Sequence, residues 1–292
     1  MSTTTIAPTG VSPPFPTLPG VSITSTREIL GPDSVLCQLI WAPSGYGKTR
    51  LAGGLDALTT KYLRKRTLYI PVEAGEGGGA ATLRKLDLPI FVPKDYSDLY
   101  RVLGLLRNDK SIGGVVLDSA SEFAKQYVKP AALKYPCREN TATRSAGIAT
   151  RSDYQVMGEL MSQILRAFIG MTTHADPAYR KHIIITATDV QKEEDERVTF
   201  VGPDLPGRMR TESVQMFNQV GTITLKPVVV DGKRVLQRYL TYQADGVRQG
   251  KDRYEIYPPE ILIGGGSGPA EDLTSIYEKY WVPNMRGGSL AG

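Results

Sequence analysis

The stretch Ala42-Pro43-Ser44-Gly45-Tyr46-Gly47-Lys48-Thr49 decides the fold expected for this chain. An apolar run at residues 35–41 precedes it, and residues 50–55, which follow it, can begin a helix that continues to about Tyr62. A strand, a loop rich in small residues and a helix, in this order, are the context that a phosphate-binding loop (P-loop) requires. The small residues let successive backbone N–H groups curve round a polyphosphate, and the helix N-terminus adds the positive end of its dipole.

Within this loop, Lys48 is expected to reach the outer phosphates and the Thr49 hydroxyl to hold Mg²⁺. Ala42 departs from the pattern G-x-x-x-x-G-K-[ST], because it stands where the first Gly is expected. Alanine is acceptable there if its backbone keeps a negative φ. The plainer alternative is a Gly-rich turn with an incidental Lys-Thr, but the register of the whole motif after a strand favours a P-loop. The residues expected to contact nucleotide are Pro43, Ser44, Gly45, Tyr46, Gly47, Lys48, Thr49 and Arg50.

The composition narrows the class of protein. The chain has 292 residues, of which 41% are hydrophobic, enough for the core of one large or two small α/β domains. We expect a soluble cytoplasmic protein, because no apolar run approaches the ~20 residues of a membrane span and no signal peptide is recognisable. Two cysteines and two histidines argue against a disulfide framework or a zinc site. The net charge of +5 is compatible with nucleic-acid binding but does not demonstrate it.

Two acidic residues stand where strand-like runs end. Glu73 follows the run at residues 67–72, and Asp118 follows the run at residues 113–117. Ligands of parallel sheets bind at the carboxyl ends of the strands, so Glu73 is a candidate general base, with a solvated loop carboxylate as the alternative. Asp118 matches the Walker B pattern and is expected to support Mg²⁺ opposite Thr49.

Other patterns predict the rest of the fold. Residues 88–92 favour an edge strand because of Pro89, residues 182–188 a buried strand that begins at a structural His182, and residues 98–107 and 153–168 helices. Two strand-like runs at 220–225 and 235–242 are joined by an Asp-Gly hairpin signal. We therefore predict one α/β domain with a mainly parallel sheet, helices on both faces and an antiparallel extension at residues 220–243. The expected organisation is a flexible N-terminal arm (1–33), a core (34–258), and a Gly-rich linker with a C-terminal tail (259–292). A short helix around Glu271 to Trp281 is expected within this tail.

Two segments, residues 129–152 and 189–211, lack periodicity and are predicted to be irregular. Long polar loops inside a compact domain are usually functional or mobile. The first segment is basic, whereas the second contains the acidic run Glu193-Glu194-Asp195-Glu196.

The order of P-loop, Glu73, Asp118 and a later strand with a polar exit resembles that of RecA-like P-loop ATPases. It is most similar to phage-encoded AAA-domain ATPases of the single-strand annealing type, from about Ser34 to Arg253. The resemblance implies a RecA-like fold with ATP and Mg²⁺ as cofactors. It also implies that Glu73 polarises the attacking water and that Asp118 supports Mg²⁺. Thr188 stands at the position of a γ-phosphate sensor that is often Gln in the family.

The resemblance also implies partners. They are single-stranded DNA at the two irregular segments, further copies of the chain in a ring or filament, and a single-strand binding protein, all in the cytoplasm of a phage-infected host. Lys251 or Arg253 would reach the nucleotide of a neighbouring subunit as a cation in trans. The expected DNA contacts are Lys129, Lys134, Arg138, Arg144, Arg208 and Arg210.

Two functions therefore stay open. One is a Mg²⁺-dependent ATPase that binds single-stranded DNA and promotes annealing or recombination. The other is a nucleotide-controlled assembly or switch protein, such as a loader or packaging accessory, that does not bind DNA directly. The acidic run favours the second function, because adjacent carboxylates repel phosphate. The choice between ATP and GTP is not readable from these residues.

Overall fold

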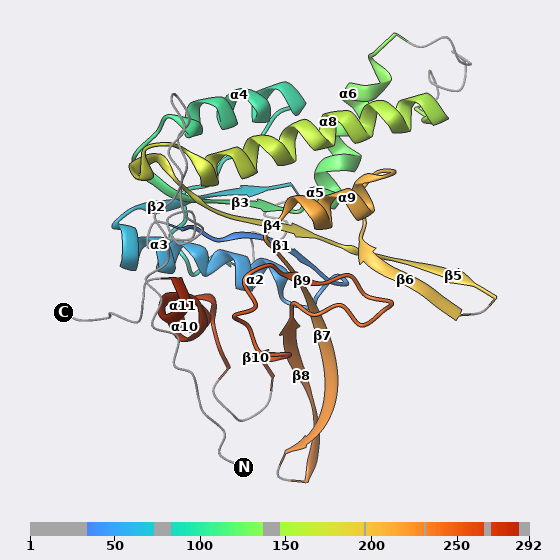
Figure 1. The fold of residues 1–292 in the computed structure, drawn as a ribbon. Coiled ribbons are helices and arrows are strands. Elements are labelled where there is room, and N and C mark those ends of the chain that lie inside the picture. The colour runs from blue at the N-terminus through green and yellow to red at the C-terminus, as the bar shows by residue number, and fades with distance from the viewer. Residues whose placement is uncertain are drawn as a thin grey trace, which may run out of the picture.

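The computed structural model describes residues 34–72, 83–136, 147–195, 197–230, 232–265 and 270–285 (Figure 1). Its main sheet has the strand order β10-β8-β7-β1-β4-β3-β2, and β9 pairs with β7 outside this path. The five strands from β7 to β2 are parallel, whereas β8, β9 and β10 are antiparallel to their partners. The bounds are β1 (Cys37–Trp41), β2 (Arg66–Pro71), β3 (Ile112–Asp118), β4 (His182–Ala187), β7 (Gln219–Val230), β8 (Lys233–Thr241), β9 (Lys251–Asp252) and β10 (Ile261–Gly264). The predicted mainly parallel sheet with an antiparallel extension is confirmed.

Helices cover both faces of this sheet, as predicted (Figure 1). The central strands are mainly apolar because both of their faces are buried. Leu39 of β1 belongs to the core on one side of the sheet, and its neighbour Ile40 to the core on the other. The longer helices are α3 (Leu55–Leu63), α4 (Tyr96–Arg107), α8 (Arg151–Gly170) and α9 (Met209–Met216), and the shorter ones are α2 (Lys48–Gly53), α5 (Ala120–Phe123) and α6 (Lys129–Leu133). No helix in the described ranges is long and apolar enough to cross a membrane.

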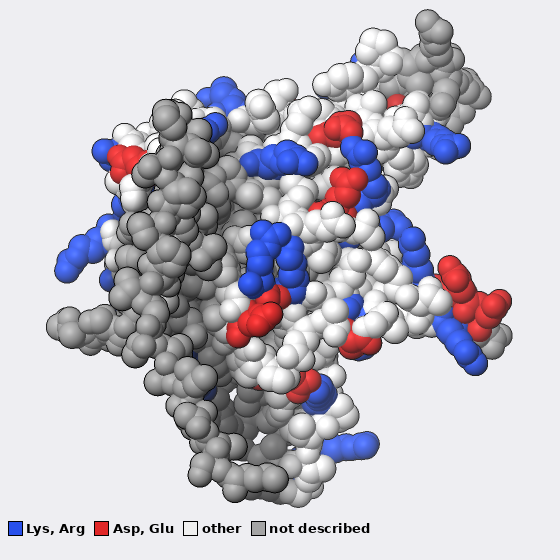
Figure 2. Space-filling model, viewed as in Figure 1, with Lys and Arg blue, Asp and Glu red and all other residues white. Residues whose placement is uncertain are grey.

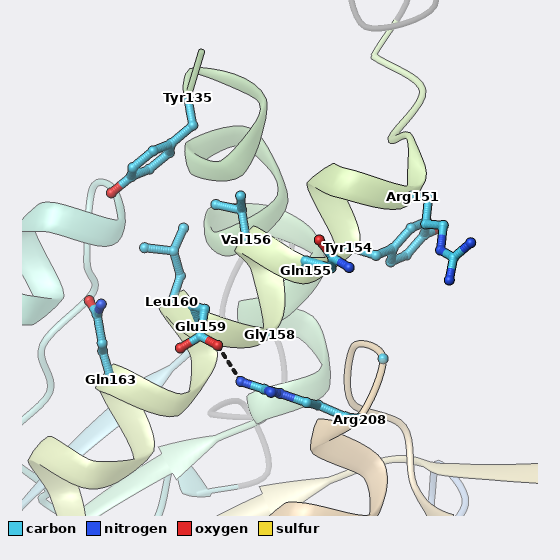
Figure 3. A pocket seen from close by; sticks show the side chains of 11 residues that line it. Tyr135, Arg151, Tyr154, Gln155, Val156, Gly158, Glu159, Leu160, Gln163 and Arg208 are labelled. Atoms are coloured by element: carbon cyan, nitrogen blue, oxygen red, sulfur yellow. Dashed lines mark hydrogen bonds and ion pairs between the residues drawn. The ribbon is translucent and has the colours of Figure 1, made fainter. Parts of the chain in front are cut away.

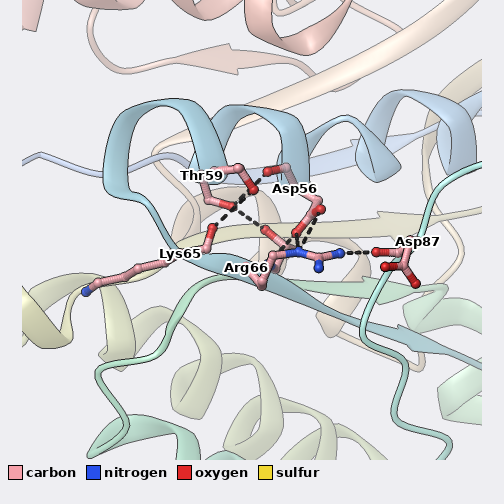
Figure 4. Close-up of polar contacts among 7 residues, drawn as sticks. Asp56, Thr59, Lys65, Arg66 and Asp87 are labelled. Carbon is pink, nitrogen blue, oxygen red and sulfur yellow. Dashed lines mark hydrogen bonds and ion pairs between the residues drawn. The ribbon is translucent and has the colours of Figure 1, made fainter.

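Asp56 ties α3, the second helix after the P-loop, to the sheet (Figure 4). Its carboxylate accepts hydrogen bonds from Arg66 Nε at 3.1 Å and from the Thr67 backbone N–H at 2.7 Å. Arg66 also donates to the backbone oxygen of Asp87. These contacts fix α3 to the start of β2. Since α2 and α3 are separated only by Gly54, they also restrict where α2 can lie over the sheet.

Several predicted elements differ in detail from the structure. The helix expected to continue to about Tyr62 breaks at Gly54. Residues 88–92 form only an isolated parallel bridge, Tyr69 to Ile90, instead of a strand. Pro89 accepts a bond from Tyr69 N at 2.9 Å but has no N–H with which to extend the ladder. The helices predicted at residues 98–107 and 153–168 begin earlier than predicted, at Tyr96 and Arg151. Asp95 caps α4, and the Thr150 backbone N–H donates to Asp153 at the start of α8.

The two segments predicted to be irregular contain regular structure. Residues 129–133 form α6, and α9 begins at Met209 within the second segment. Residues 189–203 form an antiparallel hairpin of β5 (Asp189–Glu194) and β6 (Arg197–Pro203). This ribbon is largely exposed, so it lacks the alternation of apolar residues that a half-buried strand requires, and its sequence reads as a polar loop.

The chain beyond residue 258 also contributes to the body of the protein. The sequence predicts a linker and tail here, but β10 pairs with β8. The short helix expected around residues 271–281 is present and extends to Met285. It consists of α10 (Leu273–Ile276), the π-helical turn η5 (Tyr277–Trp281) and α11 (Val282–Met285). It buries Leu273 and Trp281 in the core cluster that contains α3, and Tyr62 of α3 donates to Glu278 at 2.9 Å.

Candidate functional site

The P-loop follows β1 at the carboxyl edge of the parallel strands, and its backbone explains its residues. Gly45 and Gly47 have φ values of 79° and 98°, in the left-handed region that favours glycine. Ala42 is not among the described residues with positive φ, so the departure from the motif introduces no backbone strain there. Ala42 is fully buried, and its N–H donates to Ala187 O at 3.2 Å, which anchors the loop to β4.

Lys48 lies within the loop itself. Its side chain is buried, and Nζ donates to the backbone oxygens of Ala42 at 2.7 Å and Pro43 at 3.0 Å. The cation is therefore held at the loop that would enclose a polyphosphate. Arg50, which was expected to contact nucleotide, is exposed on α2.

Thr49 and Asp118 meet directly. Thr49 lies in the first turn of α2, after β1, and Asp118 ends β3, two strands away in the sheet. Thr49 Oγ1 donates to Asp118 Oδ2 at 2.6 Å. A hydroxyl and a carboxylate at a P-loop suit Mg²⁺, which uses one or two protein ligands together with phosphate oxygens and water. No cluster of three or more His, Cys, Asp or Glu able to hold a metal occurs in the described ranges, so the remaining ligands would come from nucleotide and water.

Two further hydroxyl groups converge on Asp118, and the sequence reasoning missed both. Tyr69 of β2 donates to Asp118 Oδ2, and Thr186 of β4 donates to Asp118 Oδ1. The register explains the second contact, because Leu117 pairs with Ile185 and the next residues are therefore Asp118 and Thr186. The available signal in the sequence was Thr186, a polar residue directly after the apolar run Ile183-Ile184-Ile185. Asp118 is buried, with 3% of its surface exposed.

The positions of the other predicted catalytic residues differ. Glu73 lies outside the described residues, although its predecessor Val72 donates from its N–H to Asp118 O at 2.8 Å. Thr188 follows β4 at the same edge of the sheet. Its N–H donates to Ser121 Oγ at 3.0 Å and its oxygen accepts from Asp204 N at 2.8 Å.

Lys251 and Arg253 lie near the amino ends of the parallel strands, whereas the P-loop lies at their carboxyl ends. Lys251 pairs with Val220 near the start of β7, whereas the P-loop follows the end of the neighbouring parallel strand β1. Lys251 Nζ donates to the oxygens of Val214 and Gln215, both at 3.0 Å, and Arg253 Nη2 donates to Gln215 O at 3.3 Å. Burial lowers the pKa of Lys251, and the charge of Arg253 adds to this effect. Within the subunit, both cations bind backbone oxygens at the end of α9.

Four of the six residues expected to contact DNA lie in the described ranges. Lys129 and Lys134 lie on and just after α6, whereas Arg138 and Arg144 fall outside the described residues. Arg208 pairs with Glu159 and, at 3.2 Å, with Glu212. Arg210 donates to Leu205 O at 3.1 Å and lies 3.9 Å from Asp204. The two arginines are therefore engaged with groups of the protein.

A cavity of about 700 Å³ lies beside these cations, between the first half of α8 and the turn before α9 (Figure 3). Val156 and Leu160 contribute apolar surface, and the ion pair of Arg208 with Glu159 borders it. Tyr135 and Tyr154 are 50% and 51% exposed at this cavity. The site thus combines accessible aromatic rings with charged groups.

The tip of the β5–β6 hairpin is acidic. Glu193, Glu194 and Asp195 are exposed there, and Figure 2 shows carboxylates gathered at the projecting end of this hairpin. On the rest of the visible face, cationic and anionic side chains are intermixed (Figure 2).

A known protein family matches most of this chain. The family model described as AAA domain (AAA_24) matches residues 35–254. One similar solved structure is the flagellar accessory protein FlaH from Methanocaldococcus jannaschii. It is 12% identical, with a TM-score of 0.40, and the match covers 79% of this chain and 84% of that chain. No curated protein matches significantly. Because the family match spans most of the chain and includes the P-loop, Lys48, Thr49 and Asp118, the chain belongs to the AAA domain family.

Proposed function

We propose that this protein is a Mg²⁺-dependent ATPase. The observation that carries the proposal is the 2.6 Å contact between Thr49 Oγ1 and Asp118 Oδ2 at the end of the P-loop. In this proposal Lys48 binds the phosphates, and Thr49 and Asp118 hold the metal. Mg²⁺, when bound, neutralises charge that develops on the transferring phosphoryl group. Tyr69 and Thr186 orient the Asp118 carboxylate through their hydroxyl groups.

Glu73 is the proposed residue that orients the attacking water, and Thr188 the proposed γ-phosphate sensor. Both roles rest on position in the sequence. Phosphate release from ATP and from GTP, measured with Mg²⁺ and with EDTA, tests the activity and shows whether the adenine or the guanine nucleotide is preferred. Equal release with Mg²⁺ and with EDTA would contradict the metal role of Thr49 and Asp118.

We also propose single-stranded DNA as a partner, bound beside α6 and the first half of α8. Lys129 and Lys134 supply positive charge near this surface, and Tyr135 and Tyr154 expose rings there. Stacking of a base on an aromatic side chain contributes ~1–3 kcal/mol and tolerates any sequence. Annealing or recombination of strands would follow from such binding.

The alternative is a nucleotide-controlled assembly or switch protein without direct DNA binding. Two observations favour it: Arg208 and Arg210 are engaged with carboxylates, and the β5–β6 tip carries exposed acidic side chains. The phosphates of a DNA backbone would have to compete with the carboxylates that pair with Arg208 and Arg210. They would also be repelled by the acidic tip of the hairpin.

Fluorescence anisotropy with a labelled oligo(dT) strand separates these functions. For a DNA-binding protein we expect the affinity to fall steadily as salt rises from about 50 to 200 mM, because phosphate contacts release counterions. Tyr154→Ala should weaken binding about 5- to 100-fold, the range that corresponds to one lost stacking contact. Tyr100→Ala is the matched control, because Tyr100 is 52% exposed on α4 and does not line the cavity. Absence of binding at low salt, with and without ATP, would favour the switch protein.

We further propose that the active form is an oligomer in which Lys251 or Arg253 reaches the P-loop of the next subunit. Their location opposite their own P-loop supports this arrangement. A cation supplied in trans to a phosphoryl-transfer site is worth about 10³–10⁵ in rate. Arg253→Ala and Lys48→Ala should each be inactive alone and recover part of the activity when mixed, since each supplies the half-site that the other lacks. No recovery, together with a specific activity independent of protein concentration, would exclude the trans cation.

A further inference from the structure

Arg238 of β8 lies against the P-loop, although the two are far apart in the sequence. A Cβ atom built on Gly47 would stand 3.5 Å from Arg238 Cδ and 3.7 Å from Arg238 Nε. A Cβ atom built on Gly264 of β10 would stand 3.7 Å from the same Cδ and 3.8 Å from Nη1. These are van der Waals distances, so the arginine side chain lies directly beside both glycines, one on the P-loop and one on the strand that pairs with β8.

This arginine is incompletely satisfied by the part of the chain that the structure describes. Its Nε is buried and has no hydrogen-bond partner among those residues. In the described ranges, no carboxylate forms an ion pair with its guanidinium. A buried donor without a partner costs about 1–3 kcal/mol, and more when it is charged, so such a group beside a binding loop calls for an acceptor from outside the chain.

We propose that Arg238 donates hydrogen bonds to a phosphate oxygen of the nucleotide bound in the P-loop of the same subunit. The inference rests on the proposed nucleotide binding and adds a residue that the P-loop motif does not contain. A guanidinium carries five N–H donors in a planar fork, and its bonds to phosphate are charge-assisted. The antiparallel extension of the sheet thereby brings a cation to the loop in cis. Lys251 and Arg253 lie at the other edge of the sheet and would act in trans.

The test compares Arg238→Met and Arg238→Lys with the wild type. Methionine retains the aliphatic stem that packs beside Gly47 and Gly264, and thermal unfolding checks that each variant folds. The measurement is the Kd for Mg-ATP by calorimetry, together with the inhibition constant of inorganic triphosphate in competition with labelled ATP. Arg234→Met is the matched control, because Arg234 lies on the same strand, is exposed and does not approach the P-loop glycines.

We expect Arg238→Met to weaken the binding of ATP and of inorganic triphosphate by a similar factor of about 10–100, which corresponds to one lost hydrogen bond to a charged group. Arg238→Lys should retain part of the affinity, and Arg234→Met should bind like the wild type. Unchanged affinity in Arg238→Met, or a loss confined to ATP with inorganic triphosphate unaffected, overturns the phosphate contact while the proposed function stands. If the wild type binds no nucleotide, or binds it as well after Lys48→Ala, the proposed function falls and this inference falls with it.

Discussion

Lys48→Ala is expected to weaken ATP binding by about 30- to 4000-fold and thereby to abolish turnover at ordinary ATP concentrations. The ammonium group is buried within the P-loop and bonded to Ala42 O and Pro43 O, so it is already placed where phosphate oxygens would lie. Removal of one partner of a buried charge pair typically costs about 2–5 kcal/mol, and each 1.4 kcal/mol is a factor of ten in affinity.

Titration calorimetry with a slowly hydrolysed ATP analogue measures this loss directly. Lys233→Ala is the control, because Lys233 is an exposed lysine at the tip of the β7–β8 hairpin. Near-normal affinity in Lys48→Ala, with unfolding unchanged, would show that the loop does not enclose the phosphates.

Asp118→Asn is expected to lower the rate of hydrolysis at least about 100-fold while nucleotide binding persists. A metal ion supplies several kcal/mol of charge stabilisation in the transition state, and each 1.36 kcal/mol is a factor of ten in rate. The amide also disturbs the local hydrogen bonds. The carboxylate accepts from the hydroxyls of Thr49, Tyr69 and Thr186, whereas one end of an asparagine side chain is only a donor. We therefore expect a loss of stability of about 1–3 kcal/mol as well.

Comparison with Glu73→Gln separates the metal site from the base. Glu73→Gln should bind Mg-ATP normally and lose hydrolysis with unchanged Mg²⁺ dependence, whereas Asp118→Asn should need more Mg²⁺ for half-maximal activity. Both quantities come from steady-state phosphate release across a Mg²⁺ series, with urea unfolding as the check on stability. Wild-type hydrolysis in Glu73→Gln would assign the base to another residue, with Glu76 the next to test.

Short-range patterns of the sequence were sufficient for the P-loop and for the class of fold. The loop is a local structure, because the positive φ of Gly45 and Gly47 is set by the residues themselves. The buried parallel strands are mainly apolar, and the β7–β8 hairpin has its own turn residues, so both can be recognised without knowledge of their neighbours. The role of Asp118 at the end of β3 could be predicted only because a P-loop precedes that strand.

Only the tertiary structure decided which side chains from separate elements share the site. Tyr69 and Thr186 lie within strands whose residues otherwise serve the core, and they meet Asp118 because of the register of β2, β3 and β4. Arg238 approaches Gly47 because β8 pairs with β7, and β7 is the neighbour of β1, the strand that the P-loop follows. The exposed β5–β6 hairpin escaped prediction because a ribbon in solvent needs no apolar face. Strand order and register are set by the joint packing of distant segments, and no local pattern of residues encodes them.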